Sequence, residues 1–481
     1  MKGNKKLGKI LHTILKKCVI LQRKTVRDVA QPGSALRSGR RGRKFESCHP
    51  DFVNASLIFS GWLFCKESKM KPHIEIMAPV GSYEALAAAI QAGAGSVYFG
   101  IGKLNMRSRS AKNFTLDDLR QLAETCAENN VKSYVTVNTV IYDEEMDEMH
   151  QLLDAIKANG ISAIIASDQS VIQYARQIGV EVHMSTQCNI TNLEAVRYYS
   201  QFADVMVTAR ELNIDQVKYI TEQIEKQQIR GPHGDLVRIE VFCHGALCMA
   251  ISGKCNLSQD LFNSSSNRGA CLQLCRRGYD VREREEGYEL MLDNEYIMSP
   301  KDLCTLPFLD RVLDAGVEVL KIEGRGRSPE YTKLTVSVYS EAVKAIQEGT
   351  FTQEKIDAWM ERLKSVYNRG FWDGYYLGRR TFEWSKQYGS HATKTKEYVG
   401  LITNYYSKLG VAEIRMDSDV LQLGDGIMII GPTTGVYEDT LSEIRVDLGS
   451  VEQTVKGEYC SIPVKSLVRR GDKVYKVVST M

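Results

Sequence analysis

The stretch IEIMAPVGSYEALAAAIQAGAGSVYFG, residues 74–100, contains the pattern that decides the fold. A short β-type run at 74–78 is followed by a helical run at 82–93, whose apolar residues lie three or four positions apart, and by a second β-type run at 96–100. The alternation continues along the chain, with β-type runs at 133–138, 162–167, 180–185, 204–208, 237–243 and 317–322 and helical runs at 115–129, 145–159, 192–201, 330–347 and 354–366. This order predicts an α/β fold, and eight strands favour a TIM-like (β/α) barrel.

Two regions depart from this alternation. A β-like pair at 288–292 and 295–298 interrupts the chain before the last barrel strand, so the barrel is expected to be irregular or to carry an inserted hairpin. After Tyr398 short β runs are separated by Gly and Asp, at 398–404, 410–415, 427–430, 441–445 and 473–478. Such spacing is typical of a small antiparallel β-barrel. We therefore predict a barrel domain over 70–390 and a β-barrel domain over 391–481.

The first 69 residues differ in composition from the rest. They contain 16 Lys and Arg against 4 Asp and Glu, although the whole chain has a net charge of only +3, so the remainder is acidic. A secretion signal would need its apolar run close to the N-terminus, whereas here the run lies at 55–65 and no small-residue cleavage site follows it. The segment RKFESCHP, residues 43–50, looks like a tRNA gene read as protein. We therefore expect the natural start at Met70 and a non-native or disordered segment over 1–69.

Five of the 12 cysteines fall between Cys243 and Cys275. The spacing is Cys248-x₆-Cys255-x₁₅-Cys271-x₃-Cys275, and Cys304 lies further on. Without a secretion signal a disulfide framework is disfavoured. Structural zinc usually takes two Cys-x₂-Cys pairs, which this segment lacks. Soft thiolates at wide, uneven spacing favour an iron-sulfur cluster over zinc, although spacing alone leaves both open.

The same segment carries a family signature. EVFCHGALCMAISGKCNLS at 240–258 and NRGACLQLCR at 267–276 resemble the collagenase-like peptidase family U32. Further matching pieces are APVGS at 78–82, HMSTQ at 183–187, KDLC at 301–304, KIEGR at 321–325 and NRGF at 368–371. The layout is most similar to the branch that hydroxylates tRNA uridine.

The resemblance implies a 4Fe-4S cluster held by four cysteines, oxygen-independent hydroxylation, and prephenate as the oxygen donor. It implies Cys248, Cys255, Cys271 and Cys275 as the metal ligands, with Cys304 as the alternative fourth ligand. The expected substrate is a tRNA, with ribosomal RNA or a protein as alternatives. The expected location is the cytoplasm, away from membranes.

The name peptidase has weak support in the residues, because the chain has neither His-Glu-x-x-His nor Gly-x-Ser-x-Gly. Cys243 and His244 are neighbours on a predicted strand, so their side chains point to opposite faces and do not suit a nucleophile and its base. A collagenase-like peptidase nevertheless stays open as an alternative, as does a structural or maturation factor that binds metal.

Polar residues at the ends of the predicted strands are the other site candidates, because active sites of such barrels form there. As catalytic residues we predict His244, Glu240, His183 and Glu323, which would carry protons or hold the substrate. As cofactor-binding residues we predict Lys321, Arg325, Gln187 and Asn138, the cations facing a phosphate or a carboxylate. A hydrogen-bonded structural histidine is the alternative for His183, and a buried ion pair is the expectation for Glu211.

The acidic body argues against a broad positive surface for nucleic acid. Local basic patches are expected instead, at Arg276–Arg277, Arg325–Arg327, Arg379–Arg380 and Lys465–Lys473.

Overall fold

A computed structural model describes residues 73–480 except 110, 112, 281–295 and 379–382. The predicted segment 1–69 and the predicted strand at 288–292 therefore lie outside the described residues. The barrel strands are β1 (Glu75–Pro79), β2 (Ser96–Gly100), β3 (Lys132–Val137), β4 (Ala163–Ala166), β5 (Val182–Met184), β6 (Val205–Val207), β7 (Arg238–Ala246) and β9 (Val319–Ile322). All neighbouring pairs among these strands are parallel, and β9 pairs with both β1 and β7. The eight-stranded barrel is thus closed, as predicted.

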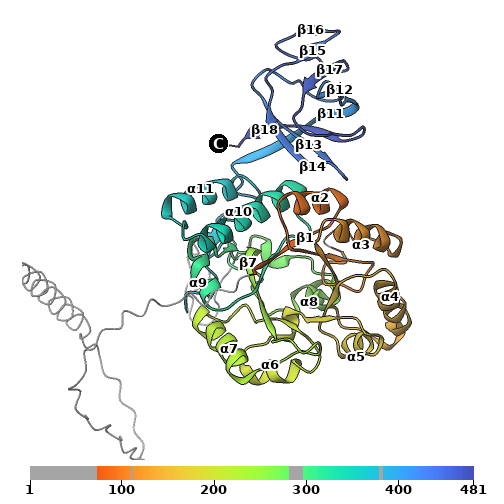
Figure 1. The fold of residues 1–481 in the computed structure, drawn as a ribbon. Helices are drawn as coiled ribbons and strands as arrows, with labels where there is room; N and C mark the ends of the chain where they lie inside the picture. The colour runs from red at the N-terminus through yellow and green to blue at the C-terminus, as the bar shows by residue number, and fades with distance from the viewer. Residues whose placement is uncertain (1–72, 110, 112, 281–295, 379–382, 481) are drawn as a thin grey trace, which may run out of the picture. The chain divides into compact units, whose positions relative to one another are not determined.

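Helices surround the barrel (Figure 1). They are α2 (Tyr83–Gln91), α3 (Leu119–Glu128), α4 (Met146–Ala158), α5 (Gln169–Ile178), α6 (Leu193–Tyr199), α7 (Ile214–Gln227), α9 (Leu309–Asp314), α10 (Pro329–Gln347) and α11 (Gln353–Lys364). Local capping sets where several of them begin. The Ser82 hydroxyl accepts a bond from the Ala85 N–H at the start of α2, and Asn213 accepts one from the Gln216 N–H at the start of α7.

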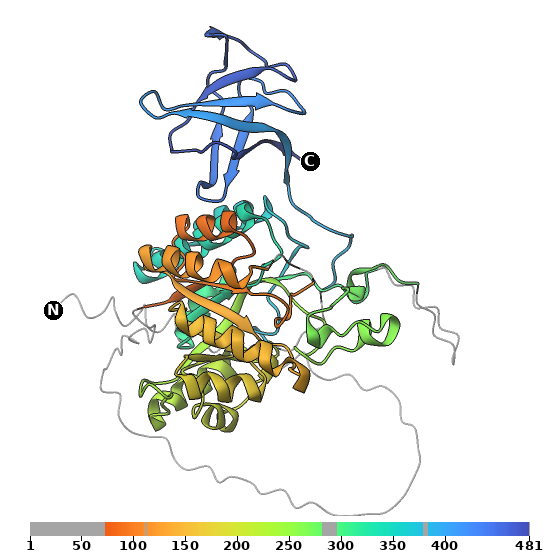
Figure 2. The same cartoon turned by 90° about the vertical axis from the view of Figure 1, so that its right-hand side faces the viewer.

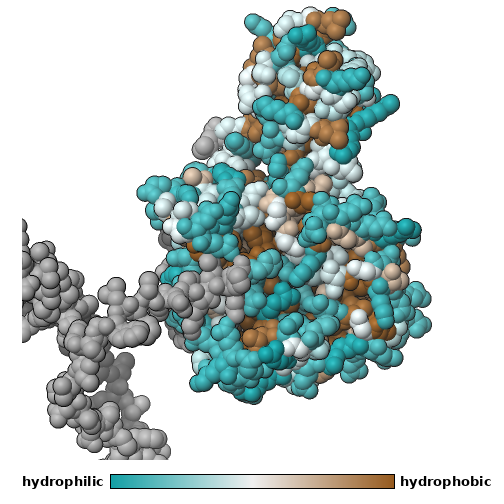
Figure 3. Space-filling model, in the orientation of Figure 1, coloured by the Kyte–Doolittle hydropathy of each residue, from teal (hydrophilic) through white to brown (hydrophobic). Residues whose placement is uncertain are grey.

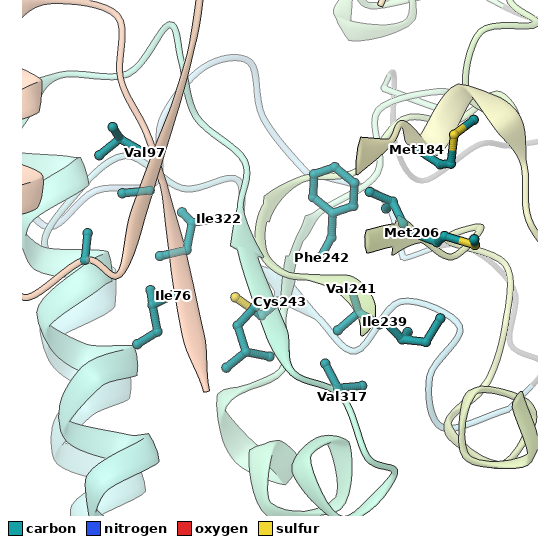
Figure 4. Close-up of a cluster of buried hydrophobic side chains, with 14 of the residues drawn as sticks. Ile76, Val97, Met184, Met206, Ile239, Val241, Phe242, Cys243, Val317 and Ile322 are labelled. Carbon is teal, nitrogen blue, oxygen red and sulfur yellow. The ribbon is translucent and has the colours of Figure 1, made fainter. Parts of the chain in front are cut away.

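The barrel strands bury both faces. On β7, Ile239, Val241 and Cys243 belong to the large apolar core that the helices share (Figure 4). The alternate residue Glu240 belongs to the barrel interior, where a separate apolar cluster includes Met77, Tyr98, Tyr134, Ala163, Ile165, Val205 and Val319. This burial on both sides explains the near-continuous apolar runs in the sequence.

The connection from β7 to β9 is longer than the others. It contains α8 (Leu257–Phe262) and β8 (Asp302–Cys304), which pairs antiparallel with the end of β7 and parallel with β10 (Phe371–Trp372). Figure 2 shows the part coloured green projecting at one end of the barrel. The predicted strand at 295–298 is wrong where it is described, because residues 296–298 form coil and a turn. An insertion is present, and the strand that its described residues form is β8.

The C-terminal part is an eight-stranded antiparallel sheet with its own apolar core. Its strands are β11 (Lys394–Tyr406), β12 (Val411–Met416), β13 (Gly426–Gly431), β14 (Gly435–Thr440), β15 (Arg445–Val446), β16 (Gly449–Ser450), β17 (Tyr459–Pro463) and β18 (Lys473–Ser479). The predicted strand at 441–445 is wrong apart from Arg445, because Leu441 and Ile444 are buried in the core from irregular backbone. Strands β14, β16 and β17 were not predicted.

Polar side chains cover most of the outer face shown in Figure 3, with smaller apolar areas among them. Among the described residues, no helix combines the length and the apolar character needed to cross a bilayer.

Candidate active site

The cysteine segment leaves the end of β7 and folds over the rim of the barrel. Buried Leu247, Ala270 and Leu274 anchor it. Gly269 has φ +78°, and a Cβ there would lie 2.2 Å from the Ser108 hydroxyl, so only glycine allows the segment to approach the loop after β2 this closely. The segment is therefore held against the end of the barrel at which the strands terminate, where a TIM-like barrel builds its site.

The four cysteines of this segment lie in one electrostatic neighbourhood. Burial raises the pKa of the Cys275 thiol, Arg276 opposes this, and the thiols of Cys248, Cys271 and Cys255 raise the pKa further. Cys248 is exposed and the other three are partly buried, so the group borders solvent.

This donor set suits a soft metal, because it consists of thiols alone. Within the described ranges, however, no three Cys, His, Asp or Glu side chains converge tightly enough to surround one ion.

Cys304 lies elsewhere. It is buried on β8, with its Sγ 3.8 Å from the Tyr339 hydroxyl and 3.8 Å from the Met360 Sδ. Burial raises the pKa of Cys243 well above its usual range, and Cys304 raises it further, so these two buried thiols are neighbours. The structure thus brings Cys275 together with the other three cysteines and leaves Cys304 with Cys243.

A pocket adjoins the cysteines, and its lining is dominated by arginine. The charged and thiol residues around it are Arg107, Arg210, Arg276, Arg327, Arg369, Glu323, Cys248, Cys271 and Cys275. We call this the arginine pocket. Five guanidinium groups face one carboxylate.

Two of these cations are neutralised. Arg107 pairs with Glu323 at 2.7 Å, and Arg369 pairs with the buried Asp302 at 3.1 Å. Burial alone would raise the pKa of Glu323, but Arg107 and Arg210 outweigh it and lower the pKa to about 2. Glu323 is therefore ionised at neutral pH and is a weak base.

The other three arginines form no ion pair with a described residue, although Arg210 lies close enough to Glu323 to lower its pKa. Arg276 donates to neutral oxygens only, at 2.6 Å to the Leu247 carbonyl and 2.7 Å to the Pro300 carbonyl. The Arg210 guanidinium stacks on Phe242 at 4.0 Å while its buried Nε has no partner, and Arg327 stacks on Tyr367 at 3.5 Å. Unpaired, partly buried cations of this kind are well suited to bind an anion, and guanidinium groups bind carboxylates bidentately.

Three of the four predicted metal ligands line the arginine pocket, but of the residues predicted as catalytic or cofactor-binding only Glu323 does. Glu240 and Lys321 form a buried ion pair of 2.8 Å inside the barrel, with the Lys321 Nζ 4.6 Å from the centre of the Tyr98 ring. The Tyr98 hydroxyl donates to Glu323 at 3.2 Å. The Glu240–Lys321 ion pair therefore acts on the arginine pocket indirectly, through Tyr98 and its bond to Glu323.

The two predicted histidines are buried. His183 bonds Glu181 at 3.0 Å and packs on Tyr134, which fits a structural histidine. His244 lies among Tyr331, Tyr339 and Phe371, and burial lowers its pKa to about 4. It is neutral at physiological pH and does not line the pocket.

Asn138 and Gln187 support the cysteine segment. The Asn138 side-chain amide donates to Gln187 at 3.3 Å, and Gln187 packs against Gly253. Arg325 is buried beside Thr136.

Glu211 is exposed and has no ion pair in the described part of the chain, so the expected buried pair is wrong.

Sequence reasoning missed Arg107 and Arg369 as pocket residues. Arg210 follows β6 directly, so the strand-end rule points to it. Arg107 lies seven residues beyond β2, in a loop whose path no sequence pattern predicts.

Comparisons with known proteins agree with the signature. The model of peptidase family U32 matches residues 81–386. A protein named collagenase, from Porphyromonas gingivalis, is 58% identical over 84% of this chain and 97% of its own length. The tRNA hydroxylation protein P1 of Bacillus subtilis is 31% identical over 77% of this chain and 86% of its own. The 23S rRNA 5-hydroxycytidine C2501 synthase of Escherichia coli is 31% identical over 57% of this chain and 40% of its own.

Proposed function

Because this chain belongs to peptidase family U32, we propose that it is an iron-sulfur enzyme that hydroxylates RNA, with a tRNA uridine as the target and prephenate as the oxygen donor. The observation that carries the proposal is the arrangement of four thiols beside a pocket with three unpaired arginines. Two relatives named for hydroxylation of tRNA and of 23S rRNA support the reaction class.

In this proposal Cys248, Cys255, Cys271 and Cys275 hold a 4Fe-4S cluster. Such a cluster supplies electron transfer or binding of a substrate oxygen at iron. The cluster would border the arginine pocket directly, because three of the four cysteines line it.

The chain's own residues would bind and orient an anionic co-substrate. Prephenate carries two carboxylates, and Arg210, Arg276 and Arg327 are three cations that form no ion pair with a described residue. Glu323 stays ionised and holds Arg107 in place at 2.7 Å. Its low pKa suits a positioning role better than proton transfer.

The alternative is a collagenase-like peptidase, which the name of the 58% identical relative favours. A peptidase of this kind would need a nucleophile and a base, for which Cys243 and His244 were the candidates. Neither is among the described residues that line the arginine pocket, and both are buried. Burial also keeps the Cys243 thiol protonated.

The test is to purify the protein without oxygen, measure iron and sulfide per chain, and analyse nucleosides of RNA from a deletion strain. We expect a brown protein, and hydroxyuridine in tRNA that disappears on deletion and returns with the wild-type gene but not with Cys271→Ala. The matched control is Cys460→Ala, which removes a buried thiol from the C-terminal sheet. Colourless, iron-free protein that cleaves gelatin would overturn the proposal in favour of the peptidase.

A further inference from the structure

A second, basic cleft lies beside the arginine pocket. Its lining comes from the start of α2, the loop after β9, the start of α10 and the strands β11 and β18. The cationic residues in it are Arg109, Arg325, Arg327, Lys396 and Lys473. We call it the basic cleft, and Arg327 borders both it and the arginine pocket.

The charge in the basic cleft is not balanced by the described residues. Lys396 pairs with Glu330 at 2.6 Å. Arg109, Arg325, Arg327 and Lys473 form no ion pair with another described residue, and Glu84 is the one carboxylate among the described lining residues. A surplus of positive charge gathers on a body that is acidic as a whole, which marks the cleft as a site for an anion.

Arg325 is built into the floor of this cleft. It is only 5% exposed, and it donates to the Thr136 hydroxyl at 2.7 Å. A Cβ on Gly100 would lie 2.7 Å from the Arg325 guanidinium, so a glycine is needed to make room for this cation. The Glu323 carboxylate lies close enough to act on the pKa of Arg325 but forms no ion pair with it, so the cost of burying this guanidinium is offset only in part and an anion in the cleft would offset it further.

Backbone dipoles point into the same space. Helix α10, 19 residues long, begins at the cleft with Pro329, and its Ser328 makes no side-chain capping bond. Helix α2 also begins there, after Ser82. The positive ends of two helices add to the four cations, which is the environment that phosphate groups prefer.

We propose that the basic cleft binds the phosphodiester backbone of the RNA substrate, next to the nucleotide whose base approaches the arginine pocket. This inference rests on the proposed function. The cations come from several separate elements, so they suit successive phosphates better than one small anion. Arg327 lines both spaces, so they are adjacent, and an enzyme that acts on a base must hold the flanking backbone while the base is turned out.

The test is the salt dependence of binding between anaerobically purified protein and fluorescently labelled, unfractionated tRNA from the deletion strain. The variant is Arg109→Gln with Lys473→Gln, two exposed cleft residues that do not line the arginine pocket. The matched control is Lys226→Gln with Lys344→Gln, which removes the same charge from the last turns of α7 and α10, at the other end of the barrel.

We expect the cleft variant to bind several-fold more weakly and its slope of log affinity against log salt to fall by about 1.4 to 2, because two phosphate contacts are lost. The control should match the wild type, and all three proteins should contain equal iron. Equal slopes for the cleft variant and the wild type, or an equal loss in the control, would overturn the cleft assignment alone. A wild-type protein that does not bind tRNA would overturn the proposed function as well. Complete competition by millimolar inorganic phosphate would show a site for one small anion and would also refute the backbone assignment.

Discussion

Glu75, at the start of β1, offers a quantitative test of how the barrel is closed. Its carboxylate is 1% exposed, accepts a bond from the Tyr134 hydroxyl at 2.8 Å, and pairs with Lys132 at 3.2 Å and Arg238 at 3.3 Å. These partners belong to β3 and β7, so one side chain on β1 joins three strands. Burial raises the pKa of Glu75, but Lys132 and the hydrogen bonds outweigh burial and lower it to about 2 from 4.5.

A carboxylate with this lowered pKa stabilises the folded state by about 3 kcal/mol at pH 7. The contribution is complete above pH 4.5 and is lost as the pH falls through 2, so about 2 kcal/mol should remain at pH 3.5. Glu75→Gln keeps the shape and removes the charge. We expect it to lower the free energy of unfolding by about 3 kcal/mol at pH 7 and by about 2 kcal/mol at pH 3.5.

Urea unfolding followed by circular dichroism at both pH values measures this. The control is Glu124→Gln, which removes an exposed carboxylate paired with Arg120 and should cost about 0.5 kcal/mol or less. A Glu75→Gln effect that does not change between the two pH values, or that is no larger than the control, would refute the reasoning.

Three further predictions concern the site. Cys275→Ser should remove most of the bound iron. Cys304→Ser should keep the iron but lower the free energy of unfolding by about 1 to 3 kcal/mol, because a hydroxyl then lies in the apolar core. Iron analysis and urea unfolding distinguish the two variants. Arg210→Lys keeps the charge but loses the planar stack on Phe242, so calorimetry should show prephenate binding weakened about tenfold, and unchanged binding would contradict the pocket assignment. Gly245→Ala should lower the free energy of unfolding by more than about 2 kcal/mol, since φ is +105° and the new Cβ would lie 2.3 Å from the Glu323 carbonyl oxygen. The control Gly349→Ala, with open space around it, should cost about 1 kcal/mol. Equal unfolding midpoints for the two variants would exclude the clash.

The barrel was predictable because its strands are buried on both faces. Runs such as 74–78 and 317–322 are mainly apolar, interrupted only by Glu75 in the first and by Glu318 and Lys321 in the second, and helical periodicity separates them. Strand β8 was missed because Asp302–Cys304 is too short to show a period, and its pairing depends on where β7 ends. Strand β17 was missed for a related reason, since only two of its five residues are buried.

The residues of the site could be predicted only where they lie close together in the sequence or directly after a predicted strand. The cysteine spacing and Glu323 at a strand end could be identified directly. The choice between Cys275 and Cys304 could not be made from spacing, because both follow Cys271 and only the fold separates them. Arg107 and Arg369 both line the pocket although they are 262 residues apart in the sequence, and no local sequence pattern predicts that they lie close together.

The cysteines and the arginines reach the pocket by different routes. All four cysteines belong to one continuous segment, 248–275, while most of the cations come from the loops after β2, β6 and β9 and from the turn before β10. The segment proposed to hold the metal is thus one continuous piece of chain, whereas the residues proposed to bind the substrate come from separate loops. Substitutions in those loops would change which molecule is accepted while the thiol segment stays intact, so the proposed metal centre would serve different substrates in different members of the family.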